Sequence, residues 1–131
     1  MSSRILIADD HSLLRSVLKT ALEGHADWHV CAEARNGLQA VQKAAELKPD
    51  VIILDFAMPV MDGLQAAREI LLASPGVPIL MFTNYAFPAL AVEAIRAGVR
   101  RVVDKGTGAH ELLTAVEALL GDQPRSTPAS A

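Results

Sequence analysis

Short apolar runs alternate five times with stretches of helical periodicity along this chain. The runs are four to seven residues long, which suits strands better than helices. They cover residues 4–8, 28–34, 51–54, 77–82 and 101–104. Apolar strands separated by helices are typical of parallel sheets that are covered on both faces. The alternation therefore predicts an α/β fold in which five parallel strands form one doubly wound sheet.

The segments between these runs have the periodicity and the end signals of helices. Apolar residues recur three and four positions apart, Asn36 with Gln39 forms a capping-box pattern, and Asp62 is a favourable N-cap residue. The predicted helices cover residues 12–23, 36–47, 62–73, 87–97 and 109–120. Residues 122–131 are rich in proline, serine and alanine. We therefore expect one domain over residues 1–121, followed by a flexible tail over 122–131.

The length and charge of the chain exclude several classes of function. Its 131 residues, 51% of them hydrophobic, suffice for the core of one domain. The net charge of −3 and the lack of a large Lys/Arg cluster argue against nucleic-acid binding. No apolar stretch reaches membrane-spanning length, and a single cysteine, Cys31, excludes an internal disulfide. We expect a cytoplasmic protein that binds neither nucleic acid nor membrane.

Charged and hydroxyl side chains stand at the ends of four of the five predicted strands. They are Asp9 and Asp10 after the first strand, Asp55 after the third, Thr83 after the fourth and Lys105 after the fifth. In an open parallel sheet, ligands bind outside the carboxyl ends of the strands. These side chains are therefore expected to share one site.

Three carboxylates at one edge of a sheet repel each other by several kcal/mol at an effective dielectric of ~20, so a cation is needed beside them. Oxygen ligands with room for water and a phosphoryl group favour Mg2+ over Ca2+ or Zn2+. A metal-held carboxylate is a known nucleophile toward phosphorus. Taken singly, the residues also have ordinary interpretations: the acid pair caps a helix, Asp55 lies in a turn, Thr83 is a strand former and Lys105 is a surface cation.

Two motifs and the residues that follow them resemble those of a known family. They are ILIADDH at 5–11, DFAMPVMDG at 55–63, Thr83 after an apolar strand, Ala97-Gly98 and Lys105. In this order they resemble the receiver domain of bacterial two-component response regulators, over residues 4–120. The resemblance implies a flavodoxin-like (βα)5 fold with strand order 2-1-3-4-5. His11 after the two acids is typical of the subgroup that usually carries a C-terminal helix-turn-helix.

The resemblance implies a Mg2+ site built from the acids. Asp10 and Asp55 would bind the ion through their side chains, and Asp9 mainly through water. Ala57 would contribute its backbone carbonyl. Mg2+ is the one cofactor that the resemblance implies.

The resemblance also implies that Asp55 accepts a phosphoryl group from a sensor histidine kinase or a phosphotransfer protein. Lys105 would contact Asp55 and the phosphoryl group, and Thr83 would move toward a phosphoryl oxygen. This movement would repack the surface of the fourth helix, the fifth strand and the fifth helix, which is the family's usual dimer face. The expected output is partner binding, including a phosphorylation-dependent homodimer, rather than substrate turnover by an enzyme.

Three positions depart from the family's pattern, and two more bear on its hydrolysis chemistry. Val102 stands where an aromatic residue usually swings inward, and valine has little reach because it has one side-chain torsion. Asn84 replaces a very small residue, and Gly106 replaces a frequent proline. Ala57 and Tyr85 flank the expected path of the hydrolytic water, and neither side chain is suited to orient it. Slow self-dephosphorylation is the resulting hypothesis.

Two other functions compete with this interpretation. In the first alternative, the chain is the isolated receiver portion of a DNA-binding transcriptional regulator. Any DNA binding then requires residues outside the given sequence. A small phosphotransferase or phosphatase enzyme is the second. It is weaker, because the chain has no glycine-rich phosphate loop, no second acid two residues after Asp55 and no cap domain.

Overall fold

Five parallel strands form one sheet. The computed structural model describes residues 2–121, and its strands are β1 (Ser3–Ala8), β2 (Trp28–Ala34), β3 (Val51–Leu54), β4 (Ile79–Thr83) and β5 (Arg101–Asp104). Their order across the sheet is β2-β1-β3-β4-β5, and each neighbouring pair is parallel. The predicted flavodoxin-like architecture and strand order are confirmed. The tail predicted for residues 122–131 lies outside the described residues.

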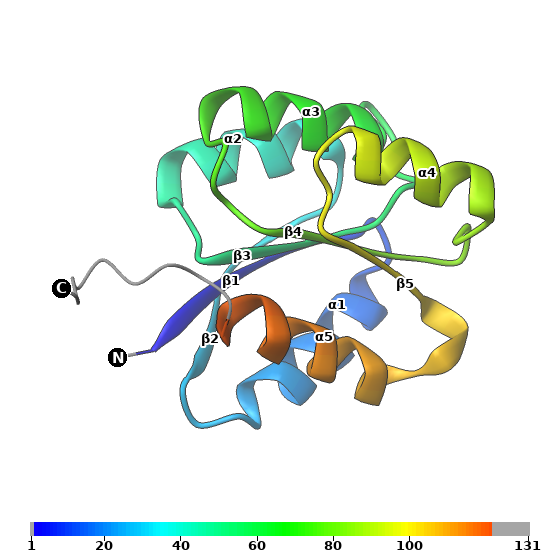
Figure 1. The fold of residues 1–131 in the computed structure, drawn as a ribbon. Helices are drawn as coiled ribbons and strands as arrows, with labels where there is room; N and C mark the ends of the chain where they lie inside the picture. The colour runs from blue at the N-terminus through cyan, green and yellow to red at the C-terminus, as the bar shows by residue number, and fades with distance from the viewer. Residues whose placement is uncertain (1, 122–131) are drawn as a thin grey trace, which may run out of the picture.

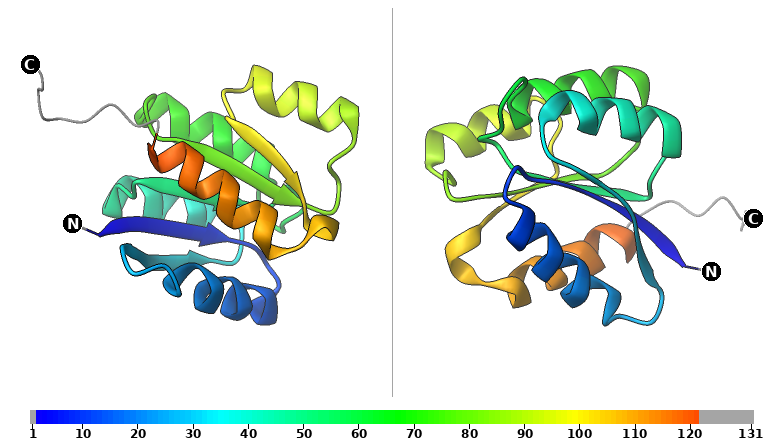
Figure 2. Two further views of the ribbon diagram at one scale, coloured as in Figure 1. Left: turned by 60° about the horizontal axis from the view of Figure 1, so that its bottom comes forward. Right: turned by 180° about the vertical axis from the view of Figure 1, so that it is seen from behind.

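Helices cover both faces of the sheet. They are α1 (Ser12–Glu23), α2 (Gly37–Leu47), α3 (Gly63–Ala73), α4 (Pro88–Arg96), the short 3-10 helix η1 (Lys105–Thr107) and α5 (Ala109–Gly121). Helices α1 and α5 lie on one face, and α2, α3 and α4 lie on the other (Figure 1, Figure 2). Between residues 2 and 121, no helix has the length and the hydropathy needed to cross a membrane.

Alternate residues of β1, β3, β4 and β5 enter two separate cores. The core under α1 and α5 takes one set of strand residues, which includes Ile5, Ile7, Val51, Ile53, Leu80 and Phe82. The core under α2, α3 and α4 takes the other set, which includes Leu6, Ala8, Ile52, Leu54, Ile79 and Met81. Side chains of successive strand residues point to opposite faces, so an uninterrupted apolar run serves both cores.

Side chains close the N-termini of the first three helices. His11 Nδ1 accepts a hydrogen bond from the Leu14 N–H at 3.1 Å, and this makes His11 the N-cap of α1. Asn36 and Asp62 cap α2 and α3 as predicted, through bonds of 2.8 Å in both cases. Phe87, the N-cap of α4, makes no such bond. The fourth helix therefore begins without the side-chain cap that the other three have.

Two glycines allow the loop after β3 to pack closely. A Cβ atom on Gly63 would lie 1.9 Å from the backbone oxygen of Asp55, and one on Gly37 would lie 2.2 Å from the oxygen of Met61. The Gly63 N–H instead donates to the Phe56 oxygen at 2.7 Å. Asp62-Gly63 is thus more than ordinary turn chemistry, because any larger residue at 63 would displace Asp55.

Strand β4 is shifted from its predicted range of residues 77–82. The Val77 N–H bonds to the Ser74 oxygen at 3.2 Å in a turn, and Pro78 has no N–H to donate to the sheet. At the other end Thr83 pairs with Asp104 of β5. Thr83 is therefore the last residue of the strand.

Candidate functional site

The carboxyl ends of the strands surround a hollow of about 510 Å³. Its lining residues come from the ends of β1, β3, β4 and β5 and from the loops that follow them. They are Asp9, Asp10, His11, Leu14, Asp55, Ala57, Asn84, Tyr85 and Lys105. Strands β1 and β3 are neighbours, but the helices that follow them lie on opposite faces (Figure 1). The hollow thus lies where ligands bind in open parallel sheets.

The sheet itself positions Asp9 and Asp55. The Asp9 N–H donates to the Ala34 oxygen at 3.0 Å, and the Asp55 N–H donates to the Ala8 oxygen at 2.9 Å. Both acids are buried, with 1% and 6% of their surface exposed. Asp10 is exposed, and within residues 2–121 its carboxylate has no hydrogen-bond or ion-pair partner. The two adjacent acids therefore differ in freedom: Asp9 is held, and only the backbone places Asp10.

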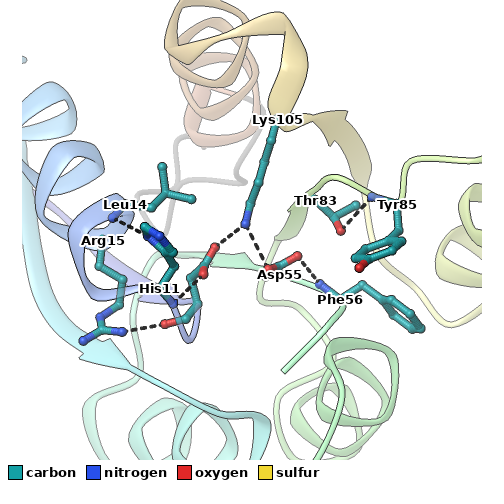
Figure 3. A network of polar contacts seen from close by, with 9 residues as sticks. His11, Leu14, Arg15, Asp55, Phe56, Thr83, Tyr85 and Lys105 are labelled. Atoms are coloured by element: carbon teal, nitrogen blue, oxygen red, sulfur yellow. Dashed lines mark hydrogen bonds and ion pairs between the residues drawn. The ribbon is translucent and has the colours of Figure 1, made fainter. Parts of the chain in front are cut away.

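Lys105 bridges the two buried carboxylates. Its Nζ lies 2.6 Å from Asp9 Oδ2 and 3.0 Å from Asp55 Oδ2 (Figure 3). Lys105 begins η1, directly after β5, and its side chain is 13% exposed. The contact with Asp55 matches what the family resemblance implied. The contact with Asp9 was not predicted, and it provides part of the positive charge that the acids need.

Burial and charge shift the pKa values of two groups in the hollow. Burial raises the pKa of the Asp55 carboxyl above its ordinary value, and the hydrogen bond from Lys105 opposes this shift without cancelling it. Burial lowers the pKa of the Lys105 ammonium, but its bonds to Asp9 and Asp55 outweigh burial and raise the pKa overall. Lys105 is therefore charged at neutral pH.

Thr83 lies behind the hollow and is linked to an aromatic loop. It is fully buried, and its Oγ1 accepts a hydrogen bond from the Tyr85 N–H at 3.2 Å. The Tyr85 ring packs edge-on against Phe56 and Phe87, with centroids 6.2 and 6.1 Å away. The Phe56 N–H donates to Asp55 Oδ1 at 2.7 Å (Figure 3). The end of β4 and the end of β3 are thus joined through this loop.

The hollow has the donor set of a hard cation. One oxygen from each of Asp9, Asp10 and Asp55 lies within 4.8 Å of the others. Among the described residues that line the hollow, Lys105 is the one lysine or arginine, so three carboxylates face a single ammonium. An all-oxygen set with excess negative charge fits Mg2+. Ala57 lines the same hollow.

The structure brings the predicted residues to one edge of the sheet. Asp9, Asp10, Asp55, Ala57 and Lys105 line the hollow, and Thr83 is buried beside it. The alternative in which the acid pair caps α1 is not observed, because His11 is the cap.

The positions that depart from the family's pattern lie as follows. Asn84 lines the hollow, and Val102 packs, partly buried, against the core under α2, α3 and α4. Asp104, next to Lys105, is exposed, and its Oδ1 accepts a hydrogen bond from the Gly106 N–H at 2.8 Å.

Sequence reasoning missed Arg15. This residue is in the first turn of α1, and its Nη1 donates to the backbone oxygen of Asp9 at 2.6 Å (Figure 3). A pattern-based interpretation treats Arg15 as one of the polar residues on an amphipathic helix. The register that places it against Asp9 is set by the packing of α1 on the sheet, and no local signal reports that packing.

Comparisons with known proteins agree with this geometry. The family described as the response regulator receiver domain matches residues 5–117. The chemotaxis protein CheY of Listeria monocytogenes is 37% identical over 114 residues, which cover 87% of this chain and 95% of that protein. The transcriptional regulatory protein LnrK of Bacillus subtilis is 35% identical over 113 residues, covering 86% of this chain and 51% of LnrK.

A solved structure also matches. The response regulator domain of Thermotoga maritima CheB superposes with a TM-score of 0.87 at 32% identity. The match covers 95% of this chain and 100% of that domain.

Proposed function

The chain belongs to the response regulator receiver domain family of two-component signalling, and we propose that Asp55 is its phosphoacceptor. One observation carries the proposal: the buried Asp55 carboxylate lies 3.0 Å from the Lys105 ammonium, in a hollow bordered by the exposed Asp10. A carboxylate beside a fixed cation is arranged for attack on a phosphoryl group, because phosphoryl transfer depends mainly on positioning and charge.

In the proposed reaction, a carboxylate oxygen of Asp55 attacks the phosphorus of a phosphohistidine. The new O–P bond forms as the P–N bond breaks, and the electron pair of that bond leaves with the imidazole, which takes up a proton. Lys105 Nζ, 3.0 Å from Asp55 Oδ2, neutralises charge on the phosphoryl oxygens. The histidine belongs to a sensor kinase or a phosphotransfer protein.

Receiver domains bind Mg2+ through an acidic cluster, and we assign the ligands in this chain. Asp10 and Asp55 would bind through side chains, Ala57 through its carbonyl, and Asp9 through water, since Lys105 already occupies one Asp9 oxygen at 2.6 Å. When bound, the ion would supply positive charge to the phosphoryl oxygens. The excess of carboxylates over ammonium in the hollow supports this assignment.

Thr83 would transmit the phosphorylated state. Its hydroxyl would donate to a phosphoryl oxygen on Asp55, while its Oγ1 accepts the Tyr85 N–H. Movement of Thr83 toward Asp55 would therefore pull the loop that leads to α4. We propose that the surface of α4, β5 and α5 then changes its affinity for a partner or for a second copy of this chain.

The setting of the domain follows from its relatives. The chain covers 95% of the Listeria CheY sequence but 51% of LnrK. We propose a phosphorylated interaction module first and the receiver portion of a transcriptional regulator second. In both cases we place the protein in the cytoplasm and its kinase partner upstream.

The test is the intact mass of the chain after incubation with acetyl phosphate and Mg2+. One phosphoryl adduct is expected, and it should be lost in Asp55→Asn and retained in Asp104→Asn, an exposed acid at the end of β5. Size-exclusion chromatography of the same samples reports a change in oligomeric state. An adduct that persists in Asp55→Asn contradicts the proposal.

Self-dephosphorylation should be slow in this chain. Ala57 and Tyr85 both line the hollow, and neither offers a group that orients an attacking water. Tyr85 is 45% exposed at the rim, where its ring would shield the phosphoryl group. Decay of the adduct in Mg2+ measures this, and Tyr85→Ser should shorten the half-life several-fold. A wild-type half-life of seconds would refute the hypothesis.

A further inference from the structure

Arg15 joins three segments that meet behind the acids. Its side chain is 16% exposed, its Nη1 donates to the backbone oxygen of Asp9 at 2.6 Å, and its Nε donates to Glu33 Oε1 at 3.1 Å. Arg15 belongs to α1, Asp9 to the loop before it, and Glu33 to β2. A planar guanidinium suits this task, because its donors point in fixed, divergent directions.

Glu33, the residue that binds Arg15 Nε, is itself held in place. We call the two bonds of the Arg15 guanidinium, to Asp9 and to Glu33, the clamp. Glu33 pairs with Ile7 in the sheet, and its backbone oxygen accepts a hydrogen bond from Lys43 Nζ at 2.6 Å. The backbone of Glu33 is thus fixed by β1 and α2, and the Arg15 side chain connects Glu33 to the loop that carries Asp9 and Asp10. The guanidinium is held at both ends and does not simply lie on the surface.

The carbonyl that Arg15 binds belongs to the peptide between Asp9 and Asp10. A peptide group is planar, so holding its oxygen fixes the direction in which the chain enters Asp10. The Asp10 carboxylate has no partner of its own among residues 2–121. Backbone orientation therefore places this carboxylate so that one of its oxygens lies within 4.8 Å of an oxygen of Asp9 and of Asp55.

We propose that Arg15 is a positioning residue for divalent-cation binding, which acts by fixing the Asp9–Asp10 peptide. The inference rests on the proposed function, because it concerns the Mg2+ of that same hollow. Arg15 does not line the hollow, and its charge is paired with Glu33. Its effect on the ion is thus geometric, and it is transmitted by the bond to the Asp9 oxygen.

The sign of a mutational effect separates geometry from charge. Removing a nearby positive charge should strengthen the binding of a cation if the charge of Arg15 were what mattered. Losing the clamp should instead weaken binding, because Asp10 is no longer held in place. Residues behind metal ligands commonly change metal affinity by about tenfold or more when they are mutated.

The experiment is a Mg2+ titration of the full chain, followed by backbone amide NMR shifts at a temperature well below unfolding. Arg15→Gln should weaken Mg2+ binding and so raise its dissociation constant about tenfold. Arg15→Lys retains the charge but loses the planar set of guanidinium donors, so we expect the Mg2+ dissociation constant to rise about threefold. The matched control is Arg68→Gln, an exposed arginine on α3, which should bind as the wild type does.

Each outcome has a defined meaning. Mg2+ binding in Arg15→Gln that is equal to or tighter than in the wild type overturns the inference and leaves the proposed function standing. A wild-type chain that binds no Mg2+ overturns both. Native-like amide dispersion in the variants shows that any weakening occurs in the folded state.

Discussion

The two loops that flank the acidic hollow are built in opposite ways. The loop after β1, residues 9–11, is held by polar contacts: Lys105 binds the Asp9 carboxylate, Arg15 binds the Asp9 carbonyl, and His11 caps α1. The loop after β4, residues 84–87, contains exposed aromatic rings and leads to a helix without a side-chain cap. In that loop, a single side-chain hydrogen bond, from the Tyr85 N–H to Thr83, fastens the backbone to β4.

The two loops suit different tasks: the loop after β1 binds the ligand, and the loop after β4 responds to phosphorylation. A metal site needs ligands whose positions change little, and the polar contacts around Asp9 supply that rigidity. A segment that responds to phosphorylation must change shape at low cost, which few hydrogen bonds and exposed apolar groups allow. We therefore expect mutations near Asp9 to affect stability and metal binding most. Mutations near Tyr85 and Phe87 should act mainly on local opening.

Lys105 should have the largest effect, because it is the cation between two buried acids. Lys105→Met leaves Asp9 and Asp55 without it, and breaking a buried ion pair is strongly destabilising. We expect the melting temperature in EDTA to fall by about 10 °C. Excess Mg2+ should recover much of this loss, because it restores positive charge.

The control for Lys105 is a lysine outside the hollow, and Lys19→Met serves because Lys19 is exposed on α1. A Lys105→Met variant as stable as the wild type in EDTA would contradict the interpretation that polar contacts hold the loop after β1 rigid. It would show that the two carboxylates coexist without the ammonium.

The second effect is the pH dependence of stability at Asp55. Because burial raises its pKa in the folded state, Asp55 favours folding when protonated, and this contribution is lost as pH rises from about 3.8 through the folded pKa. In EDTA, Asp55→Asn should therefore gain stability over the wild type as pH rises. Melting curves from pH 4.5 to 7.5 measure it. A difference that shrinks with rising pH gives the opposite sign and refutes the assignment.

A smaller effect is expected at the start of α4. Phe87→Ser adds an N-cap oxygen where the backbone already has the extended conformation of a cap, with φ −76° and ψ 155°. Compared with Phe87→Ala, which removes the ring alone, Phe87→Ser should melt about 4 °C higher. Hydrogen exchange in the first turn of α4 should slow in Phe87→Ser. Equal exchange in the two variants would mean that this helix end is already held.

The smallest effect is expected for Asp10. Its carboxylate is one of three acids in the hollow, so Asp10→Asn should relieve repulsion and raise the melting temperature in EDTA. Because Asp10 is exposed, solvent screens this repulsion and we expect about 1 °C. The stabilisation by Mg2+ should disappear in the same variant. An unchanged or lower melting temperature in EDTA would argue against repulsion among the acids.

The fold and the membership of the site were predictable from local patterns. Short apolar runs specify strands that are buried on both faces, and Asn36 and Asp62 specify helix starts. Strand order came from the family resemblance and not from the pattern. The start of β4 was misplaced because Pro78 interrupts the sheet inside an apolar run.

The sequence by itself determined which chemical groups gather at one edge of the sheet, because each stands at the end of a strand and parallel strands end together. Tertiary structure alone decided how these groups share their charge. Lys105 meets Asp9 across 96 residues of chain, and Arg15 reaches the Asp9 carbonyl only when α1 packs against β2. The first contact joins elements distant in sequence, and the second depends on how α1 packs on the sheet, so no periodicity or spacing encodes either of them.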